Sequence, residues 1–563
     1  MTKNPLYILI LYFQTLRYLS LRQITFKIIN ICKIIFFQNL SKFYAWLISI
    51  KIKFEVKNDF TLNWDFELKK NDYQDISRYS FSFLNQKVQF DSEIDWKNNK
   101  IFRNNLLWQY NLNYHNFLLS LINDKSANPE SKSLLIQKII TDWIDNNDLR
   151  KNKYDKNIWN PYVVSNRIIA WVKLYTHFNN YFDQDFKKKF LYNLRFQLKY
   201  LDHNLEYHLR ANHLLENSFA LIFGSVFFKD KKLFEKGKSI LNKQLKEQIM
   251  TDGAHFELSP MYHQHISYRL LDLYYYLKCS NTFNSDIENL IKSKLSIMLG
   301  WLEKITFTNG DIPTVNDCSF DIYPSTKDIL KYSNKLGIIP KSKKLYESGY
   351  RFKKKNNYEL FFDSAQIGPD FNPGHAHNDI FNFILYIDKM PFIVDTGTST
   401  YSFSKRRFKE RSTSSHNTVS INGKEQSEIW SNFRVAKRVN PKIIFENDHK
   451  IISKYNSLIK NVYHKREINF YESKILLKDE INTNYLNYSY LHFHPSINIE
   501  IDNDILRTSK AEIKFSGFKE MFIEDYRYAE GFNFLKNSKK LKLVFTKDSL
   551  IEINIFGQNK TKN

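Results

Sequence analysis

PGHAHNDIFNFILYIDKMPFIVDTGT, residues 373–398, places two histidines directly before the most strand-like stretch of a lysine-rich chain. In an extended strand, alternate side chains point to the same face, so His375 and His377 are predicted to aim two imidazoles at one spot. The turn at DKMP joins this strand to a second apolar run, which ends at Asp395. The pattern predicts a β-hairpin with a polar site at its ends, unless the pair is incidental in a chain with 15 histidines.

Short alternating segments surround this hairpin from about residue 358 onward. They include YELFFDSAQ, HNTVSING, REINFYES, KILLKDEI and KLKLVFTK, and turn residues such as Asn422–Gly423 separate them. Many short strands at such spacing are typical of an antiparallel sandwich, and Asn-Gly favours a tight turn. We therefore predict an all-β half.

The preceding region, from about residue 100 to 340, has a helical pattern. SLLIQKIITDWIDNN, NRIIAWVKLYTHF and ENLIKSKLSIMLGWLEKI place apolar residues at i, i+3, i+4 and i+7. No repeat of fixed period is present, so we expect helical hairpins stacked in an array or ring. The predicted parts are a basic amphipathic segment at 1–60, a helical domain at 61–340 and an antiparallel β domain at 341–563.

The chain of 563 residues carries 83 Lys and Arg against 59 Asp and Glu, a formal net charge of +24. That balance favours a polyanionic partner, whether nucleic acid, anionic lipid or acidic polysaccharide, although an AT-rich genome gives the same composition. No recognition helix, RRM or OB signature is present, so we do not expect nucleic-acid binding. The three widely spaced cysteines indicate neither a disulfide framework nor a thiolate metal site.

The first 50 residues are basic and amphipathic. The apolar run PLYILILYF is not followed by a small-residue cleavage site. Neither it nor IINICKIIFF reaches the roughly 20 apolar residues of a spanning helix. The segment is predicted either to lie on a membrane surface as a peripheral contact or to pack as ordinary helices on the protein's own body.

A metal site is one interpretation of the polar groups near the hairpin. His377, Asp395 and His416 stand at predicted strand ends and form an N/N/O set suited to Zn²⁺. His375 would then face a substrate. The alternative is that these are ordinary surface histidines and a strand-end aspartate, because ligands tens of residues apart follow no spacing rule.

Residues 359–430 resemble the C-terminal half of heparinase II/III-family polysaccharide lyases. The resemblance rests on GHAHND, the apolar hairpin, VDTGT, Tyr401 and the pattern R-x-x-x-x-HNT ending in QSE. The resemblance implies an α+β multidomain fold. Its expected parts are an N-terminal (α/α) toroid and a C-terminal antiparallel β-sandwich, with the active site in the cleft between them.

The resemblance extends into the helical half and implies roles for three residues. RANHLLENSFALIFG contains Asn212, which would neutralise a substrate carboxylate. DGAHFELSPMYHQH contains Tyr262, which would act as acid and, in syn eliminations, also as base. His375 would be the second base. TNGDIPTVNDCS resembles the loop at the end of the toroid, and we assign it no chemistry.

Three further residues are expected to contact the substrate. His213 and Glu216 lie on the same predicted helix as Asn212, and Arg411 lies in the basic stretch SKRRFKERS, which would otherwise be a solvated loop. His377, Asp395 and His416 would hold a structural metal, expected to be Zn²⁺, that braces the β-sandwich face and orients His375.

The implied chemistry is β-elimination on a uronate-containing polysaccharide. A base removes the proton at C5 and an acid protonates the glycosidic oxygen leaving C4, while an amide stabilises the charge on the carboxylate. A tyrosine that acts as base needs its pKa of about 10 lowered by nearby positive charge. Heparan sulfate, alginate and bacterial capsular uronates all remain candidate substrates.

The chain departs from secreted members of the family because no clear signal peptide is visible. Its opening resembles members encoded with surface-polysaccharide assembly enzymes, which favours a cytoplasmic or membrane-associated location over secretion and leaves a periplasmic one open. Two alternatives to a lyase are a metal-dependent hydrolase and a non-catalytic glycan-binding protein of capsule or O-antigen assembly.

Overall fold

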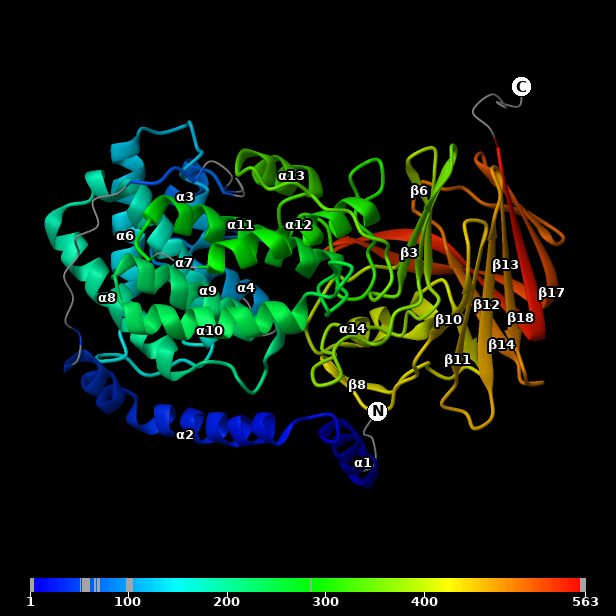
Figure 1. The fold of residues 1–563 in the computed structure, drawn as a ribbon, viewed down its shortest axis with the longest axis horizontal. Helices are drawn as coiled ribbons and strands as arrows, with labels where there is room; N and C mark the ends of the chain where they lie inside the picture. Colours follow the sequence, from blue (N-terminus) through cyan, green and yellow to red (C-terminus); the bar gives the residue numbers. More distant parts are fainter. Residues whose placement is uncertain are drawn as a thin grey trace.

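The computed structural model describes residues 5–50, 52, 61–64, 67, 71–97, 105–283 and 286–556. Helices form one half of the molecule and sheets the other (Figure 1). The predicted boundary at residue 60 lies outside the described residues. The change from helices to strands occurs between Thr326–Lys335 and Tyr350–Lys354, around the predicted boundary at 340.

Proline and a polar cap mark where several toroid helices begin. Asn128, Asn160 and Ser259 each accept a hydrogen bond from a backbone N–H of the first turn, and a proline follows each of them. The helices and 3₁₀ turns before residue 340 are α1 Pro5–Leu16, α2 Leu21–Ile50, α3 Tyr73–Ser77, α4 Leu106–Tyr114, α5 Asn116–Leu119, α6 Pro129–Asn147, α7 Pro161–Phe178, η1 Asn179–Tyr181, α8 Gln184–His203, α9 Ala211–Phe227, α10 Lys231–Gln248, α11 Pro260–Ser280, α12 Ile287–Ile305 and α13 Thr326–Lys335.

The C-terminal half is built from antiparallel sheets. A four-stranded sheet has the order β3-β4-β5-β6, and a larger sheet has the order β10-β11-β12-β13-β18-β17-β16-β15, with β14 pairing with both β18 and β7. The elements are β3 Tyr350–Lys354, β4 Tyr358–Asp363, β5 Phe383–Ile387, β6 Met390–Ile393, α14 Lys405–Glu410, η2 Thr413–Ser415, β7 Val419–Ile421, β8 Ile429–Ser431, β9 Arg434–Val435, β10 Lys442–Glu446, β11 Lys450–Asn456, β12 Tyr463–Phe470, β13 Lys474–Ile481, β14 Asn487–His492, β15 Glu500–Asp502, β16 Ile505–Arg507, β17 Ala511–Gly531 and β18 Phe534–Ile555.

Apolar side chains of the two sheets share one core. Leu385 on β5 and Leu477 on β13 belong to the same buried cluster. Burial alternates strictly along β12, as the two-residue period of a strand with one covered face requires. Asn422 and Gly423 both have left-handed φ, which confirms the predicted tight turn. The predicted class, helices followed by an antiparallel sandwich, is also confirmed.

The strands β17 and β18 are much longer than the short segments predicted from the sequence. They form a hairpin of 21 and 22 residues that reaches back toward the helices (Figure 1). At its tip, the Phe532 carbonyl accepts a hydrogen bond from Asn85, and Asn533 donates one to the Leu84 carbonyl. Leu84 and Asn85 belong to the turn between β1 Ser80–Phe83 and β2 Gln86–Gln89, so the hairpin joins the sandwich to the toroid.

The helices α1 and α2 form an N-terminal arm that runs along both halves (Figure 1). Tyr12 on α1 packs edge-on against Trp430 at 4.8 Å between ring centroids, and Phe37 on α2 lies 5.9 Å from the ring of Tyr200 on α8. The arm therefore packs on the body, as one of the two interpretations predicted. By length and composition α2 is also sufficient to cross a membrane, which the short apolar runs did not predict.

The loop that connects α10 to α11 depends on a close backbone approach. Gly253 has φ +102°, and a Cβ built there would lie 2.2 Å from the Ile297 carbonyl oxygen on α12. Gly310 has nearly the same backbone, φ +101°, but no heavy atom within 4 Å of such a Cβ. A side chain at Gly310 would therefore meet backbone strain alone, whereas a side chain at Gly253 would meet the same strain and a steric overlap with α12.

We expect Gly310→Ala to lower the free energy of unfolding by about 1 kcal/mol, the cost of placing a side chain in this backbone region. Gly253→Ala adds overlap with α12, so its loss should be about 3 kcal/mol or more. Denaturant unfolding followed by circular dichroism measures both. Equal losses in the two variants would show that the packing of this loop on α12 is unimportant.

Candidate active site

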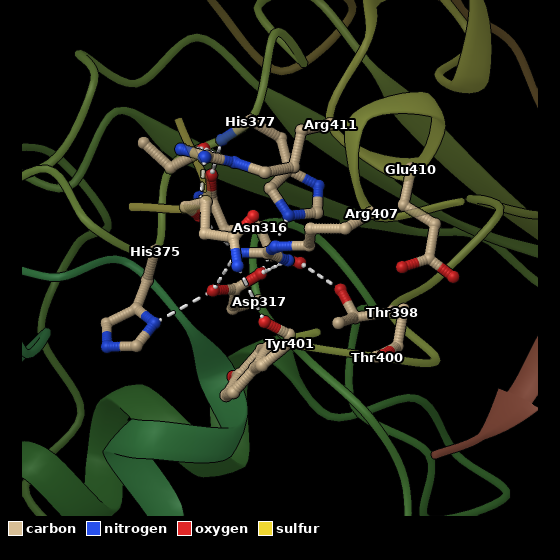
Figure 2. A network of polar contacts seen from close by, with 12 residues as sticks. Asn316, Asp317, His375, His377, Thr398, Thr400, Tyr401, Arg407, Glu410 and Arg411 are labelled. Atoms are coloured by element: carbon tan, nitrogen blue, oxygen red, sulfur yellow. Dashed lines mark hydrogen bonds and ion pairs between the residues drawn. The ribbon is translucent and has the colours of Figure 1, made fainter. Parts of the chain in front are cut away.

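Three side chains converge on the carboxylate of Asp317 (Figure 2). His375 Nδ1 donates to Oδ2 at 2.8 Å and His377 Nε2 donates to Oδ1 at 2.9 Å. The Arg407 guanidinium binds both oxygens, with Nη2 to Oδ2 at 2.8 Å. Burial raises the pKa of Asp317, but Arg407 and the two histidines outweigh it and hold this pKa well below its usual value. The carboxylate therefore stays ionised.

His375 and His377 converge as predicted, but they do not lie in a strand. β5 begins at Phe383, and both histidines are in the irregular loop before it. Their backbone is held by the loop after α12, because Asp317 N–H donates to the His375 carbonyl at 3.0 Å and His377 N–H donates to Asn316 Oδ1 at 2.9 Å. The two histidines therefore point to one carboxylate because two loops are bonded together, and not because alternate residues of a strand share a face.

The bond to Asp317 fixes the proton of His375. Because Nδ1–H points to the carboxylate, Nε2 carries the lone pair and is the basic nitrogen. It lies 3.8 Å from Glu257 Oε2, and the imidazole packs against the Tyr262 ring with 4.2 Å between centroids. The His375 side chain is 16% exposed, which is enough for contact with a ligand.

Tyr262 lies in the first turn of α11 because Ser259 caps that helix and Pro260 opens it. Its hydroxyl is 3.3 Å from the hydroxyl of Tyr401. Burial, the neighbouring tyrosines and the Asp317 charge raise the pKa of Tyr262 well above 10. The Tyr262 hydroxyl is therefore protonated at neutral pH. A basic role requires a lowered pKa, which is the opposite of what these surroundings produce.

Asn212 is held at the start of α9 by a residue to which the sequence analysis gave no role. Glu257 accepts from the Asn212 backbone N–H at 3.0 Å and from its side-chain Nδ2 at 2.9 Å. The amide is thus fixed in orientation beside His375. Glu257 stands in the same motif as Tyr262, and that motif was the only signal for it.

His213 keeps access to the site, whereas Glu216 does not. His213 Nδ1 donates to Glu206 at 3.0 Å, and its side chain is 33% exposed. Burial lowers the pKa of His213, but Glu206 together with Glu257 and Glu216 outweighs it, so the net shift is upward. Glu216 is fully buried and binds Arg269 at 2.9 Å. Its predicted substrate contact does not fit this position, because a sugar could not reach the carboxylate.

The predicted substrate contact of Arg411 also needs correction. Its side chain is buried and donates to the carbonyls of Ala376, Ser431 and Asn432. It therefore holds the loop between His375 and His377 in place instead of facing an anionic chain. The residue of this basic stretch that contributes to the site is Arg407, one helical turn earlier.

Unusual backbone conformations occur beside the polar groups of the site. Ala211, Leu258 and Asn316 have φ of 48°, 56° and 56°, although none is glycine. Each is next in sequence to Asn212, Glu257 or Asp317. Such left-handed residues cost free energy and persist only where surrounding contacts enforce them. The site is therefore held rigidly by several loops.

The three predicted metal ligands lie close together. The His377 and His416 rings are 5.4 Å apart, and Asp395 accepts from His416 Nδ1 at 2.7 Å. Across the described residues, no group of three or more His, Cys, Asp or Glu side chains has the geometry of a metal site. However, His377 Nδ1 and His416 Nε2 are buried without a hydrogen-bond partner. These two nitrogens are donors suited to a metal, whereas Asp395, predicted as a third ligand, is bonded to His416 instead.

Family models match nearly the whole chain. Residues 48–347 match the heparinase II/III N-terminus, and residues 339–555 match the heparinase II/III-like C-terminal domain. The chain belongs to the heparinase II/III family. The two matches correspond to the helical half and to the sandwich half of the structure.

Similar proteins of this family include a heparin-sulfate lyase of Bacteroides stercoris and one of Pedobacter heparinus. The chain is 24% identical to the first over 70% of its own length and 27% identical to the second over 60%. The matches span 64% and 54% of the length of these relatives. A crystal structure of heparinase III has the same fold, with a TM-score of 0.67, 16% identity, and coverage of 92% of this chain and 89% of that one.

We expect Asp317→Asn to lower the free energy of unfolding by about 3–5 kcal/mol, because it leaves the Arg407 charge buried without its partner. The double variant Asp317→Asn/Arg407→Gln should lose less than Asp317→Asn alone, since both charges are then removed. Denaturant unfolding followed by tryptophan fluorescence gives the two values.

A matched control uses an exposed pair, Asp75 and Lys87, whose side chains lie 2.8 Å apart. Asp75→Asn should cost less than about 1 kcal/mol, because solvent screens that pair. If Asp317→Asn were no more harmful than Asp75→Asn, the Asp317 carboxylate would not be holding the two halves together.

Proposed function

We propose that the protein is a polysaccharide lyase that cleaves an acidic, uronate-containing glycan by β-elimination. The observation that carries this proposal is the pairing of His375, with its basic Nε2 free, and Tyr262, with its hydroxyl protonated, at 4.2 Å between ring centroids. A base and an acid on one spot are what the elimination requires. The names of the two relatives, both heparin-sulfate lyases, support the same reaction class.

In the proposed reaction, His375 Nε2 takes the proton from C5 of the uronate. The imidazolium that forms is stabilised by the ionised Asp317 on Nδ1. Electrons from the C5–H bond form the C4–C5 double bond, and the C4–O4 bond breaks. Tyr262 donates its hydroxyl proton to the departing O4, and the proton on His375 returns to solvent or to Tyr262. General acid and base groups of this kind each contribute about 10²–10⁴-fold.

Asn212 is assigned to the substrate carboxylate. Withdrawing charge from that carboxylate makes the C5 proton more acidic, and a fixed amide needs no reorganisation to do so. Glu257 is assigned the positioning of Asn212, because it binds both the backbone and the side chain of that residue. His213, which is partly exposed, is retained as a substrate contact.

Two other functions remain as alternatives. A metal-dependent hydrolase would leave Tyr262 and Asn212 without a task. A glycan-binding protein of surface-polysaccharide assembly would need no acid and base in contact. The role in capsule, O-antigen or exopolysaccharide metabolism belongs to the proposal and rests on the N-terminal resemblance alone.

The first test is ultraviolet absorbance of the unsaturated product during incubation with heparan sulfate, alginate and bacterial acidic capsules. Wild-type protein should raise the absorbance on at least one glycan. Tyr262→Phe and His375→Ala should each lower the rate by about 10²-fold or more. Tyr274→Phe makes the same change twelve residues further along α11 and should keep the wild-type rate.

No absorbance change on any glycan, with the fold intact and binding retained, would contradict the lyase and support the assembly protein. A product without the double bond would support the hydrolase. Equal loss of rate in Tyr262→Phe and Tyr274→Phe would remove the assigned role of Tyr262.

We also propose that His377 and His416 hold a divalent metal, with Zn²⁺ as the expected ion, and that Asp395 orients His416. When bound, the metal would brace the β-sandwich face of the site. His377 Nε2–H donates to Asp317 and His416 Nδ1–H donates to Asp395, so in the neutral rings Nδ1 of His377 and Nε2 of His416 carry the lone pairs. Asp395 behind His416 is the usual arrangement of a carboxylate that orients a ligating histidine.

Metal content and thermal unfolding test this proposal without reference to turnover. His416→Ala should bind no zinc and should no longer be stabilised by added Zn²⁺. His464→Ala is the matched control, because His464 is also buried, bonds to a carboxylate at 2.7 Å and has an unpaired ring nitrogen, Nδ1. It should keep its zinc. Wild-type protein that takes up no zinc would overturn the proposal.

A further inference from the structure

The N-terminal arm, α1 and α2, has an outward face made of large apolar side chains. Among the described residues, 18 of the 35 exposed large hydrophobic side chains lie on these two helices. Phe13, Leu21 and Trp46 are 75%, 84% and 54% exposed. A concentration of this kind on one surface marks an interaction site, because single exposed apolar residues are normally scattered.

The apolar face of α2 lies opposite its docked face on both sides of a kink at Leu40, whose backbone is not helical. Before the kink, Ile28 and Ile35 are exposed seven residues apart, and after it Phe43, Trp46 and Ile50 are exposed at spacings of three and four, so each part of α2 has one exposed apolar side. The buried positions, which follow the same period half a turn away, are Gln23, Phe37, Ser41, Ala45 and Ile48. A water-facing surface helix has the reverse pattern.

The arm is fastened to both halves, so its orientation is defined. Arg438 of the sandwich lies 3.9 Å from the ring of Tyr18, which follows α1. Phe26 near the start of α2 packs on Tyr207 of the toroid at 4.9 Å between centroids. With its inner side held along its length, α2 can present its outer side to a flat surface but cannot cross a bilayer without leaving the toroid.

The charge of the arm selects among possible partners. Residues 1–54 contain eight Lys and Arg and no Asp or Glu. On α2, Lys42 is exposed beside the outer face, where a long cationic side chain can reach lipid headgroups, whereas Lys33 Nζ is bound to the His203 carbonyl of the toroid. Aromatic residues such as Phe43 and Trp46 suit the boundary between headgroups and acyl chains. Pairing with a second copy would bring two cationic arms together without a balancing acid.

We infer that the arm docks the protein in the plane of an anionic lipid surface. The outer faces of α1 and α2 enter the boundary between headgroups and acyl chains, while the flanking cations bind anionic headgroups. The active site then lies in the body carried by the arm. This inference does not depend on the proposed lyase activity.

The chain supplies its own probe for the test. Cys32 is exposed on the outer face of α2, Cys279 is exposed at the end of α11, and Cys318 is buried. The full-length variant Cys279→Ser, labelled with an environment-sensitive fluorophore at Cys32, should show a blue shift with phosphatidylcholine/phosphatidylglycerol vesicles. The shift should be at least tenfold weaker with phosphatidylcholine alone and should decrease at 0.5 M salt. The Cys32→Ser protein labelled at Cys279 should not respond.

Depth-dependent quenching separates docking from crossing. The fluorophore is attached in turn at Cys32, at Leu21→Cys and at Ile50→Cys. All three proteins carry Cys279→Ser, and the latter two also carry Cys32→Ser. A quencher placed at a shallow depth in the lipid should quench the three labels to the same extent. A crossing helix would bury Cys32 much more deeply than the two ends, and that result would overturn the in-plane arrangement.

Substitutions supply the matched comparison. Phe43→Glu/Trp46→Glu should weaken binding to the anionic vesicles at least tenfold. Ile444→Glu/Phe445→Glu, two exposed apolar residues on β10, should not change it. Equal binding by both variants would overturn the inference, and so would equal binding to neutral vesicles. A label response that needs no vesicles and rises with protein concentration would overturn it as well.

Discussion

The buried carboxylate of Asp317 is the constraint on which the rest of the site depends. It comes from the loop after α12, while Arg407, His375 and His377 come from the β half. A charge removed from water is tolerated only when its partners satisfy it. The two halves must therefore meet in one register for Asp317 to be satisfied, and the same contact sets the tautomer of His375. The contact that joins the two halves is therefore also the one that orients the His375 ring.

The surroundings of the site give its two central groups different characters. The Tyr262 hydroxyl is kept protonated by burial and by neighbouring oxygens, whereas Nε2 of the neutral His375 ring carries the lone pair because Nδ1–H donates to Asp317. The left-handed residues beside the site show that several loops hold these groups in place. Positioning, more than any single strong group, is what the structure supplies.

Periodicity was sufficient to predict the helical half and the antiparallel half, because apolar residues recur at the period of each element. The resemblance placed Asn212, Tyr262 and His375 in one cleft. Glu257 and Asp317 stand in the quoted stretches DGAHFELSPMYHQH and TNGDIPTVNDCS, but neither was assigned a role, because the sequence does not show which distant side chains a carboxylate will contact. Arg411 was chosen over Arg407 because both lie in one basic stretch, and only their burial partners distinguish them.

The β17–β18 hairpin affects how such a protein can be divided. Its tip binds the β1–β2 turn, so the halves are joined at a point far from their covalent connection near residue 340. A gene cut at that connection would give one fragment with an uncompensated Arg407 and another with an uncompensated Asp317. The two halves have the shapes of separate domains, but neither is expected to be stable without the other. Recombination between family members is therefore expected to exchange them together, as a single inherited unit.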